Sequence, residues 1–330
     1  MKDVLVLTTG GTIASQTTEN GLTPGLADDA LLTYFGEVPG VTLSSEAVMS
    51  KDSTNMQPED WLDLARRVKA YEDEYDAFII THGTDTMGYT AAALSYLLID
   101  VKKPVILTGS QVPVEAQGTD AVRNLNDALT YASQTELHGV FVVFDGRVML
   151  GTRTVKTKTK SYDAFESINY PYLAKVSSGK VRLAIIPPEE PLVGITPHLT
   201  LDTNIFVLKA FPGMPVEIFD YLAENVHALV IESFGNGGLP FQGRNLLPGI
   251  KKLVDRQIPV IITTQILEEG QEINLYEVGK QVADAGGITA GDMNTEAIVA
   301  KLMWILAETR DFETIKRLMH TPIAHDVDFV

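Results

Sequence analysis

Short apolar runs alternate with polar, glycine-rich turns along the first third of the chain. Residues 4–7, 77–80 and 104–107 are apolar runs of four residues each. Runs of that length, bounded by turn residues, predict buried β-strands. Residues 89–98 follow the second run with a longer apolar segment, which predicts a helix. The order of strand, turn and helix indicates an open, mostly parallel sheet.

The rest of the amino-terminal part adds helices, a strand and a hairpin. Residues 15–25 lack periodicity and contain many turn formers, so we predict a long loop that acts as a lid. Asp145 and Gly146 form a dipeptide that is typical of a tight hairpin turn. Further predicted elements are helices over 28–35, from Pro58 and over 119–133, and strands over 41–49, 139–144 and 147–154.

A proline-rich segment at residues 185–191 predicts a boundary between two domains. Its prolines lack an amide donor and favour extended backbone, so no helix or central strand continues through it. We therefore expect an amino-terminal catalytic domain over 1–186, a linker over 187–204 and a carboxyl-terminal domain over 205–330. The last part contains predicted strands at 205–209, 228–232 and 260–264 and helices capped by Asn294 and Asp311. The predicted fold is α/β with two domains, a larger parallel-rich doubly wound sheet with a hairpin and a smaller α/β domain.

Composition and charge limit the classes of function. The chain has 330 residues, of which 45% are hydrophobic, so it can bury a large core. Its formal net charge of −17 argues against a nucleic-acid partner. Cysteine is absent, which excludes disulfides and thiol chemistry. No apolar run reaches the roughly 20 residues that span a bilayer, and the first strand begins without a preceding signal peptide, so we expect no membrane association and a cytoplasmic location.

Hydroxyl side chains come shortly after four of the predicted strands. Thr12 follows the first strand, Ser53 follows the strand at 41–49, Thr84 and Asp85 follow 77–80, and Ser110 follows 104–107. The carboxyl ends of parallel strands meet at one edge of a sheet, where ligands bind. Glycines beside these hydroxyls allow backbone N–H groups to approach a ligand closely, as an oxyanion site requires. The pattern predicts a ligand-binding or catalytic site at this edge of the sheet.

Other kinds of site are disfavoured by spacing. The glycines after the first strand do not follow the G-x-G-x-x-G pattern of dinucleotide-binding folds, and a Walker A lysine motif is missing. The six histidines are scattered without metal-ligand spacing, and we interpret His82 as structural rather than as a ligand. We therefore expect neither a cofactor nor a metal.

Five motifs together resemble the bacterial-type L-asparaginases. The resemblance covers the whole length of the chain and is nearest to the cytosolic, type I branch. The motifs are Thr9-Gly10-Gly11-Thr12-Ile13-Ala14, Asp52-Ser53-Thr54-Asn55-Met56, His82-Gly83-Thr84-Asp85-Thr86, Thr108-Gly109-Ser110-Gln111 and Arg153-Thr154-Val155-Lys156.

The resemblance implies hydrolysis of L-asparagine to L-aspartate and ammonia. It implies that Thr12 attacks the side-chain amide to give an acyl-enzyme, and that Thr84, Asp85 and Lys156 form a relay that activates water or assists the attack. The residues alone leave open which threonine reacts first. Lys156 is distinguished by the resemblance only, because it lies in a basic run that is otherwise typical of a solvated strand edge.

The resemblance also implies how substrate is held and how subunits assemble. Asp85 would pair with the α-ammonium, and Ser53 and Thr54 would hold the α-carboxylate. We expect a homodimer or homotetramer in which a neighbouring protomer closes the site. Tyr276 and Glu277, in a predicted loop over 271–279, are candidates for that contribution.

One position departs from the family pattern. Many members have a tyrosine about ten residues after the first threonine, whereas this chain has Leu22 there. Either the relay activates Thr12 without a phenol, or a phenol such as that of Tyr276 arrives from elsewhere. Two alternatives remain: an asparaginase-like subunit of a tRNA-dependent amidotransferase, and a non-catalytic amino-acid-binding homologue. We disfavour the first because that amidotransferase component carries an extra amino-terminal domain, for which the chain leaves no room before the first strand.

Overall fold

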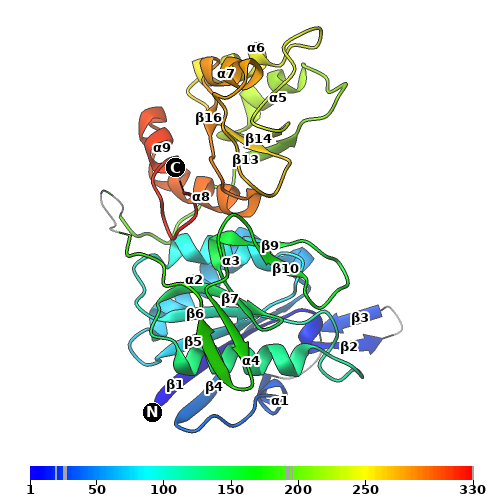
Figure 1. Cartoon of the computed structure of the whole chain (residues 1–330), viewed down its shortest axis with the longest axis vertical. Helices are drawn as coiled ribbons and strands as arrows, with labels where there is room; N and C mark the ends of the chain where they lie inside the picture. Colours follow the sequence, from blue (N-terminus) through cyan, green and yellow to red (C-terminus); the bar gives the residue numbers. More distant parts are fainter. Residues whose placement is uncertain (19–20, 25–27, 191–193, 195, 329–330) are drawn as a thin grey trace. The chain divides into compact units, whose positions relative to one another are not determined.

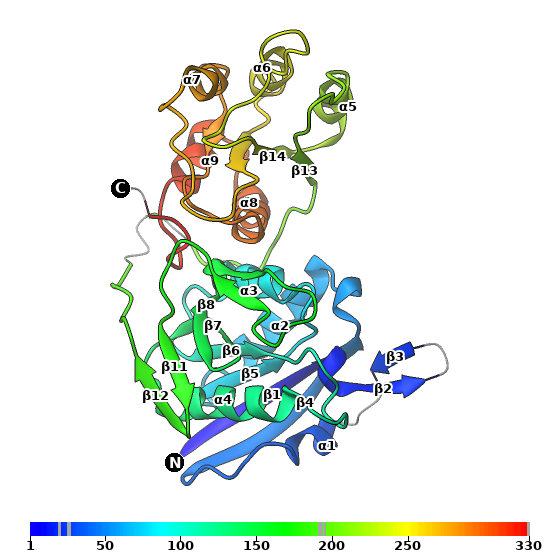
Figure 2. The ribbon, with the colours of Figure 1, turned by 45° about the vertical axis from the view of Figure 1, so that its right-hand side comes forward.

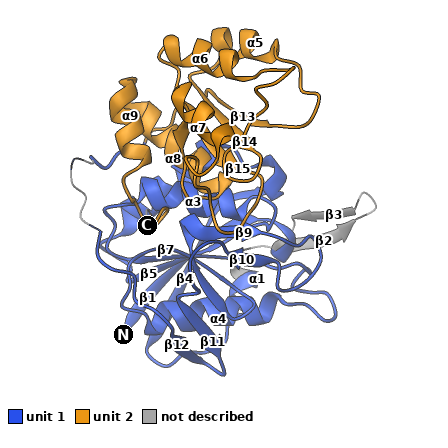
Figure 3. Ribbon diagram, turned by 45° about the horizontal axis from the view of Figure 1, so that its top comes forward, with its two compact units in different colours: residues 1–199 blue, residues 200–330 orange. Residues whose placement is uncertain are grey.

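The chain divides into two compact units, Met1–Leu199 and Thr200–Val330 (Figure 3). The computed structural model describes residues 1–18, 21–24, 28–190, 194 and 196–328, with the backbone alone for those from 14 to 29. Each unit is built around its own β-sheet. The two-domain α/β prediction is therefore confirmed.

The first unit contains an eight-stranded sheet in the order β12-β11-β8-β7-β6-β5-β1-β4. Its five strands from β4 to β7 are parallel, and the remaining three are antiparallel. The strands are β1 Lys2–Gly10, β4 Val41–Lys51, β5 Ala77–Thr81, β6 Pro104–Thr108, β7 Gly139–Phe144, β8 Arg147–Leu150, β11 Ala174–Ser177 and β12 Lys180–Leu183.

Helices cover both faces of this sheet, which explains why the central strands are continuously apolar (Figures 1 and 2). Val4 and Val6 of β1 pack in one core with residues of α1 Asp28–Leu32 and α4 Ala121–Gln134. Leu5 and Leu7 alternate to the opposite face, which α2 Pro58–Tyr71 and α3 Met87–Leu97 cover. Full burial of each such side chain contributes roughly 1.5–3 kcal/mol. The apolar runs of the sequence therefore correspond to strands buried on both faces.

The predicted tight hairpin and the helix start at Pro58 are confirmed. Strands β7 and β8 pair antiparallel around Asp145 and Gly146, and both turn residues have positive φ, 48° and 73°. That geometry is typical of two-residue hairpin turns. Pro58 is the first residue of α2, where its missing amide donor costs nothing.

Two predicted elements in the first unit are shorter than expected. The 28–35 helix ends at Leu32, because the next residues form turn bonds to carbonyls three residues back. The strand predicted over 147–154 ends at Leu150, and the chain turns through η3 Gly151–Arg153 into β9 Thr154–Lys156, which pairs with β10 Phe165–Ser167. A Cβ placed on Gly151 would lie 2.8 Å from the carbonyl oxygen of Ala91 in α3. The glycine therefore lets the backbone leave the sheet and lie against that helix.

The predicted lid loop over residues 15–25 is instead largely a hairpin. Strands β2 Ser15–Thr18 and β3 Gly21–Pro24 pair antiparallel. Backbone pairing needs no apolar period, so the side-chain pattern gave no signal of these strands. Residues 19, 20 and 25 of the predicted loop lie outside the described residues.

The second unit contains a four-stranded parallel sheet in the order β13-β14-β15-β16. The predicted helix caps are confirmed: Asn294 accepts a hydrogen bond from the amide of Ala297, and Asp311 accepts one from Thr314. The elements are β13 Ile205–Lys209, α5 Ile218–Asn225, β14 Ala228–Ser233, α6 Leu247–Asp255, β15 Val260–Thr264, α7 Glu277–Asp284, β16 Ile288–Thr289, α8 Thr295–Glu308 and α9 Phe312–Met319.

The predicted loop over 271–279 is shorter in the structure. Tyr276 is the residue before α7, and Glu277 begins that helix. A carboxylate in the first helical turn is stabilised by the free amide groups there. None of the helices among the described residues is long and apolar enough to cross a membrane.

Candidate active site

Four loops meet at the carboxyl edge of the first sheet. They follow β4, β1, β5 and β6, which are neighbours in that order. The chain passes from β1 to β4 on one side and then to β5 and β6 on the other, so the connections reverse direction between β1 and β5. Ligands of open α/β sheets bind at such a switch point. The loops that flank it carry Thr12 and Thr84.

Lys156 joins two side chains of the loop after β5. Its Nζ atom donates hydrogen bonds to Thr84 Oγ1 and to Asp85 Oδ1, each at 2.7 Å. Lys156 is 15% exposed and Asp85 is 56% exposed, so the ion pair lies at the boundary between protein and solvent. An oxygen of the Asp85 carboxylate and the oxygen of the Thr84 hydroxyl thus both lie against the Lys156 Nζ atom.

The backbone around Lys156 is fixed by a buried arginine. Lys156 ends β9 and lies opposite Phe165 of β10. Three residues earlier, Arg153 is fully buried, with its guanidinium 5.5 Å from the ring centroid of Tyr170. Stacking of a guanidinium on an aromatic ring is favourable and restricts the side chain. The buried Arg153 and the pairing of β9 with β10 explain why Lys156, at the start of a basic run, reaches a defined position.

Gln111 is a member of the site that the sequence reasoning quoted in a motif but did not assign. Thr84 Oγ1 donates to Gln111 Oε1 at 3.1 Å, and Gln111 Nε2 donates to the carbonyl of Ser161 at 3.1 Å. The carboxylate of Asp120 accepts a hydrogen bond from the backbone N–H group of Gln111 at 3.0 Å. The Thr84 proton is thus directed toward Gln111 while the lysine approaches from the other side. The position of Gln111 directly after Ser110, in one of the converging loops, was the available signal.

Ser53 is buried and engaged with the loop that carries Asp85. Its Oγ accepts from the Asp85 amide at 3.2 Å, and its carbonyl accepts from Thr86 Oγ1 at 2.7 Å. Thr54 is exposed, and its hydroxyl donates to Asp52 at 2.7 Å within the same turn. The structure therefore brings Ser53 into contact with Asp85, whereas the Thr54 hydroxyl is bonded to Asp52 of the same motif.

Thr12 begins η1 Thr12–Ala14 directly after the end of β1. The preceding Gly11 packs on the neighbouring loop: a Cβ on Gly11 would lie 2.4 Å from the amide nitrogen of Gly83. Only glycine permits this approach, and its φ of 79° also favours glycine. The residues adjacent to Thr12 and Thr84 are thus in backbone contact.

The remaining candidates belong to other elements of the chain. Tyr276 and Glu277 belong to the second unit, where the Tyr276 side chain is 58% exposed. Leu22 lies in β3 and pairs with Thr17 of β2. The structure describes only the backbone of Leu22. Across the described ranges, no three His, Cys, Asp or Glu side chains are placed to hold a metal ion.

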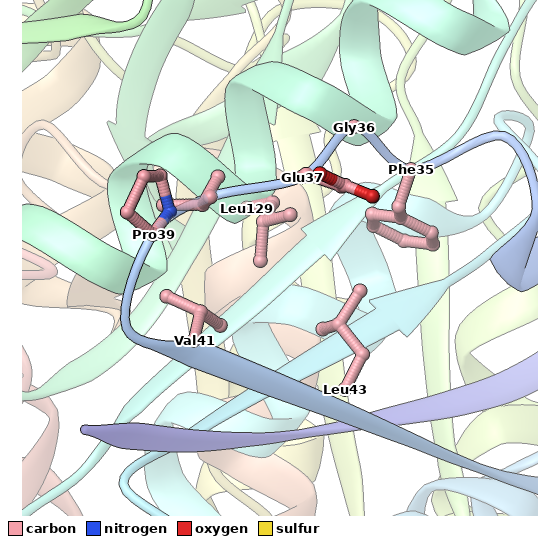
Figure 4. A pocket seen from close by; sticks show the side chains of 8 residues that line it. Phe35, Gly36, Glu37, Pro39, Val41, Leu43 and Leu129 are labelled. Carbon is pink, nitrogen blue, oxygen red and sulfur yellow. The ribbon is translucent and has the colours of Figure 1, made fainter.

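An apolar pocket of about 500 Å³ lies at the other end of the strands (Figure 4). It is lined by residues including Phe35, Val41, Leu43 and Leu129, with the Glu37 carboxylate as its charged group. Val41 pairs with Lys2 at the start of β1, far along the strand from Thr12. This pocket is therefore separate from the candidate active site.

Both units match known domain families. The model described as Asparaginase, N-terminal matches residues 3–188, and the Glutaminase/Asparaginase C-terminal domain matches residues 204–319. An enzyme named L-asparaginase from Thermococcus kodakarensis is 41% identical over 329 residues, covering 98% of each chain. L-asparaginase 1 of Escherichia coli K12 is 36% identical over 325 residues, covering 96% of each.

A solved structure of the thermostable L-asparaginase from Thermococcus kodakarensis superimposes with a TM-score of 0.91 at 40% identity, covering 99% of this chain and all of that one. A glutamyl-tRNA(Gln) amidotransferase component from Pyrococcus furiosus is 33% identical, and the match covers 98% of this chain but 76% of that protein. The fold and the matches define a two-domain α/β protein of the amidohydrolase class. The chain belongs to the bacterial-type L-asparaginase family, and the type I enzyme of E. coli is among its relatives.

Proposed function

We propose that this protein hydrolyses L-asparagine to L-aspartate and ammonia through a threonine nucleophile and a Thr-Asp-Lys relay. The contact that carries the proposal is that of Lys156 Nζ with both Thr84 Oγ1 and Asp85 Oδ1. A hydrolase requires a nucleophile whose proton has an acceptor, and Lys156, in its neutral amine form, would be that acceptor for the Thr84 hydroxyl at the switch point of the sheet. Two relatives that are named L-asparaginase support the same reaction.

Thr12 is our candidate for the first nucleophile. Its Oγ forms a bond to the side-chain carbonyl carbon of asparagine while the hydroxyl proton passes to a base, and the amide nitrogen leaves as ammonia after gaining a proton. The resulting acyl-enzyme ester is cleaved by water. Thr84, with Lys156 and Asp85, would activate that water or assist the first attack. The contact between Gly11 and Gly83 supports a short separation of the two threonine loops.

The substrate's two α-groups have candidate partners in the same loops. Asp85 is exposed and negatively charged, which suits an α-ammonium group. The Ser53 hydroxyl accepts from the Asp85 amide and so has its proton available for an α-carboxylate. Thr54 and the backbone N–H groups of the Ser53 turn would complete the carboxylate site. Fixing both α-groups would set the distance from the amide carbonyl to the nucleophile.

Release of ammonia from free L-asparagine tests this proposal directly. We expect turnover with the purified chain alone, without tRNA and without a partner protein. Ammonia release only in the presence of a tRNA-dependent system would favour the amidotransferase role, which the Pyrococcus relative makes the specific alternative. Binding of asparagine without turnover would favour a non-catalytic homologue.

We also propose a cytoplasmic homodimer or homotetramer in which Tyr276 and Glu277 approach the site of a neighbouring protomer. The exposed Tyr276 at the start of α7 supports an outward-facing role for that residue. Light scattering at assay concentration measures the assembly. A fully active monomer would exclude a required contribution from a neighbour.

A further inference from the structure

His82 is fully buried directly before the loop that carries Thr84. The Trp61 Nε1–H group of α2 donates to Thr90 Oγ1 of α3 at 2.9 Å. Thr90 Oγ1 lies 2.9 Å from His82 Nε2, and His82 Nδ1 lies 2.6 Å from the carbonyl oxygen of Gly83. These contacts form a continuous chain from two helices to the Gly83 peptide.

For a neutral ring, the direction of every hydrogen bond in this chain is fixed from both ends. The Gly83 carbonyl only accepts, so His82 Nδ1 carries the ring proton and Nε2 is an acceptor. The indole N–H of Trp61 only donates, so Thr90 accepts from it and donates its own proton to His82 Nε2. Of the two neutral tautomers, the Nδ1–H form is the one that satisfies all three contacts.

The ring stays neutral at ordinary pH. Burial lowers the pKa of His82 to about 4, and this effect outweighs the opposite influences of the Gly83 carbonyl and the Asp60 carboxylate. A proton added at Nε2 would also face the hydroxyl proton of Thr90. His82 therefore has neither a free lone pair nor an exchangeable proton for the reaction.

Gly83, whose carbonyl His82 contacts, lies with His82 at the meeting point of the loops of the site. A Cβ on Gly11 would lie 2.4 Å from the Gly83 nitrogen, and a Cβ on Gly109 would lie 2.2 Å from the His82 carbonyl oxygen. A Cβ on Gly83 would lie 2.6 Å from Ser53 Oγ. The loops after β1, β4 and β6 thus all touch residues 82 and 83. A change in the backbone of residues 82 and 83 would therefore reach each of these loops.

We propose that His82 is a positioning residue: its ring, oriented by Trp61 and Thr90, holds the Gly83 peptide and thereby the spacing of the Thr12, Ser53 and Thr84 loops. This role rests on the proposed hydrolysis for its functional meaning. It does not require His82 to touch substrate or to transfer a proton.

Two variants of Thr90 test the role without changing any group that touches substrate. Thr90→Val keeps the shape but leaves the Trp61 N–H and His82 Nε2 without a partner, whereas Thr90→Ser keeps the hydroxyl and is the matched control. We expect kcat to fall roughly 10-fold to 100-fold in Thr90→Val and to stay near the wild-type value in Thr90→Ser. The pH profile of the remaining activity should keep its shape, because His82 does not titrate.

A spectroscopic measurement reads the ring itself. Nitrogen-15 NMR of histidine-labelled protein should show His82 with a proton on Nδ1 and a bare Nε2, unchanged between about pH 5 and 8. Loss of that signal in His82→Gln assigns it among the six histidines. In Thr90→Val the Nε2 signal should shift, and in Thr90→Ser it should not.

The outcomes separate this inference from the proposed function. A proton on Nε2, a titration near neutral pH, or kcat values of the two Thr90 variants within about twofold of each other would overturn the positioning role even in an active enzyme. Failure of the wild-type protein to release ammonia would instead overturn the proposed function, while the NMR result would still report the ring. Circular dichroism of both Thr90 variants shows whether they are equally folded.

Discussion

A buried ion pair in the second unit gives a stability prediction that the structure specifies closely. Lys301 of α8 and Asp326 near the carboxyl end are both 0% exposed, and their Nζ and Oδ2 atoms lie 2.8 Å apart. Lys301 Nζ also donates to the carbonyls of Thr321 and Met319 at 2.8 and 3.4 Å, and Asp326 Oδ1 accepts from the Ile323 amide at 3.0 Å. The pair thus fixes the segment after α9 to α8.

Lys301→Met removes the cation and leaves the Asp326 carboxylate buried without its counter-charge. Breaking one side of such a pair costs about 3–5 kcal/mol of unfolding free energy. Adding Asp326→Asn removes the unpaired charge but keeps an acceptor for the Ile323 amide, so the double variant should recover much of the loss. The control is Lys251→Met on α6, whose pair with Asp255 at 3.0 Å is 67% and 60% exposed. We expect a cost of less than about 1 kcal/mol there.

Urea denaturation followed by far-UV circular dichroism measures all three free energies. The reasoning is refuted if Lys301→Met costs no more than Lys251→Met. It is also refuted if the double variant is as unstable as Lys301→Met alone, because the loss would then come from packing rather than from the unpaired charge.

Three further predictions concern pH, specificity and the missing phenol. Burial raises the pKa of Glu296 to about 7, above its unfolded value of 4.5. Its contribution to stability is therefore present below about pH 4.5 and declines by about 3 kcal/mol as pH rises from 4.5 to about 7. Urea unfolding at acid and alkaline pH should show a weaker pH dependence in Glu296→Gln, and an unchanged one would contradict the assignment. Asparagine should exceed glutamine in kcat/KM, because one added methylene displaces the amide at a cost of about 1–3 kcal/mol; equal values would contradict fixed α-groups. If the Tyr276 phenol replaces the one absent at Leu22, Tyr276→Phe should lose on the order of 10²-fold in kcat. If Tyr276→Phe keeps nearly full activity and Leu22→Tyr gains none, the relay alone activates Thr12.

The fold was largely predictable because its central strands are buried on both faces. Runs such as residues 4–7 and 77–80 have no polar face, and this alone distinguishes them from surface segments. The antiparallel pairing of β2 with β3 was missed because hydrogen bonds between backbone groups leave no period in the side chains. The departure of the chain at Gly151 was missed because it depends on contact with α3, which is distant in sequence.

The site was predictable only in its outline. Hydroxyls at the ends of neighbouring strands indicated one edge, since parallel strands align their carboxyl ends. Lys156 reaches Thr84 from a strand, β9, that pairs with β10 and follows the buried Arg153. Neither the pairing nor the burial can be recognised from the sequence around Lys156. Gln111 was passed over because an amide gives no catalytic signal by itself, and its importance comes from its contact with Thr84.

The central claim is that Lys156 acts in the relay with Thr84 and Asp85, and a pair of lysine variants tests it most directly. Lys156→Met removes the amine that contacts Thr84, whereas Lys158→Met removes a neighbouring lysine that pairs with Asp163 instead. With L-asparagine as substrate, ammonia release should show kcat reduced by about 10²-fold or more in Lys156→Met and near wild type in Lys158→Met, with both variants folded by circular dichroism. A kcat for Lys156→Met close to that of Lys158→Met would contradict the relay.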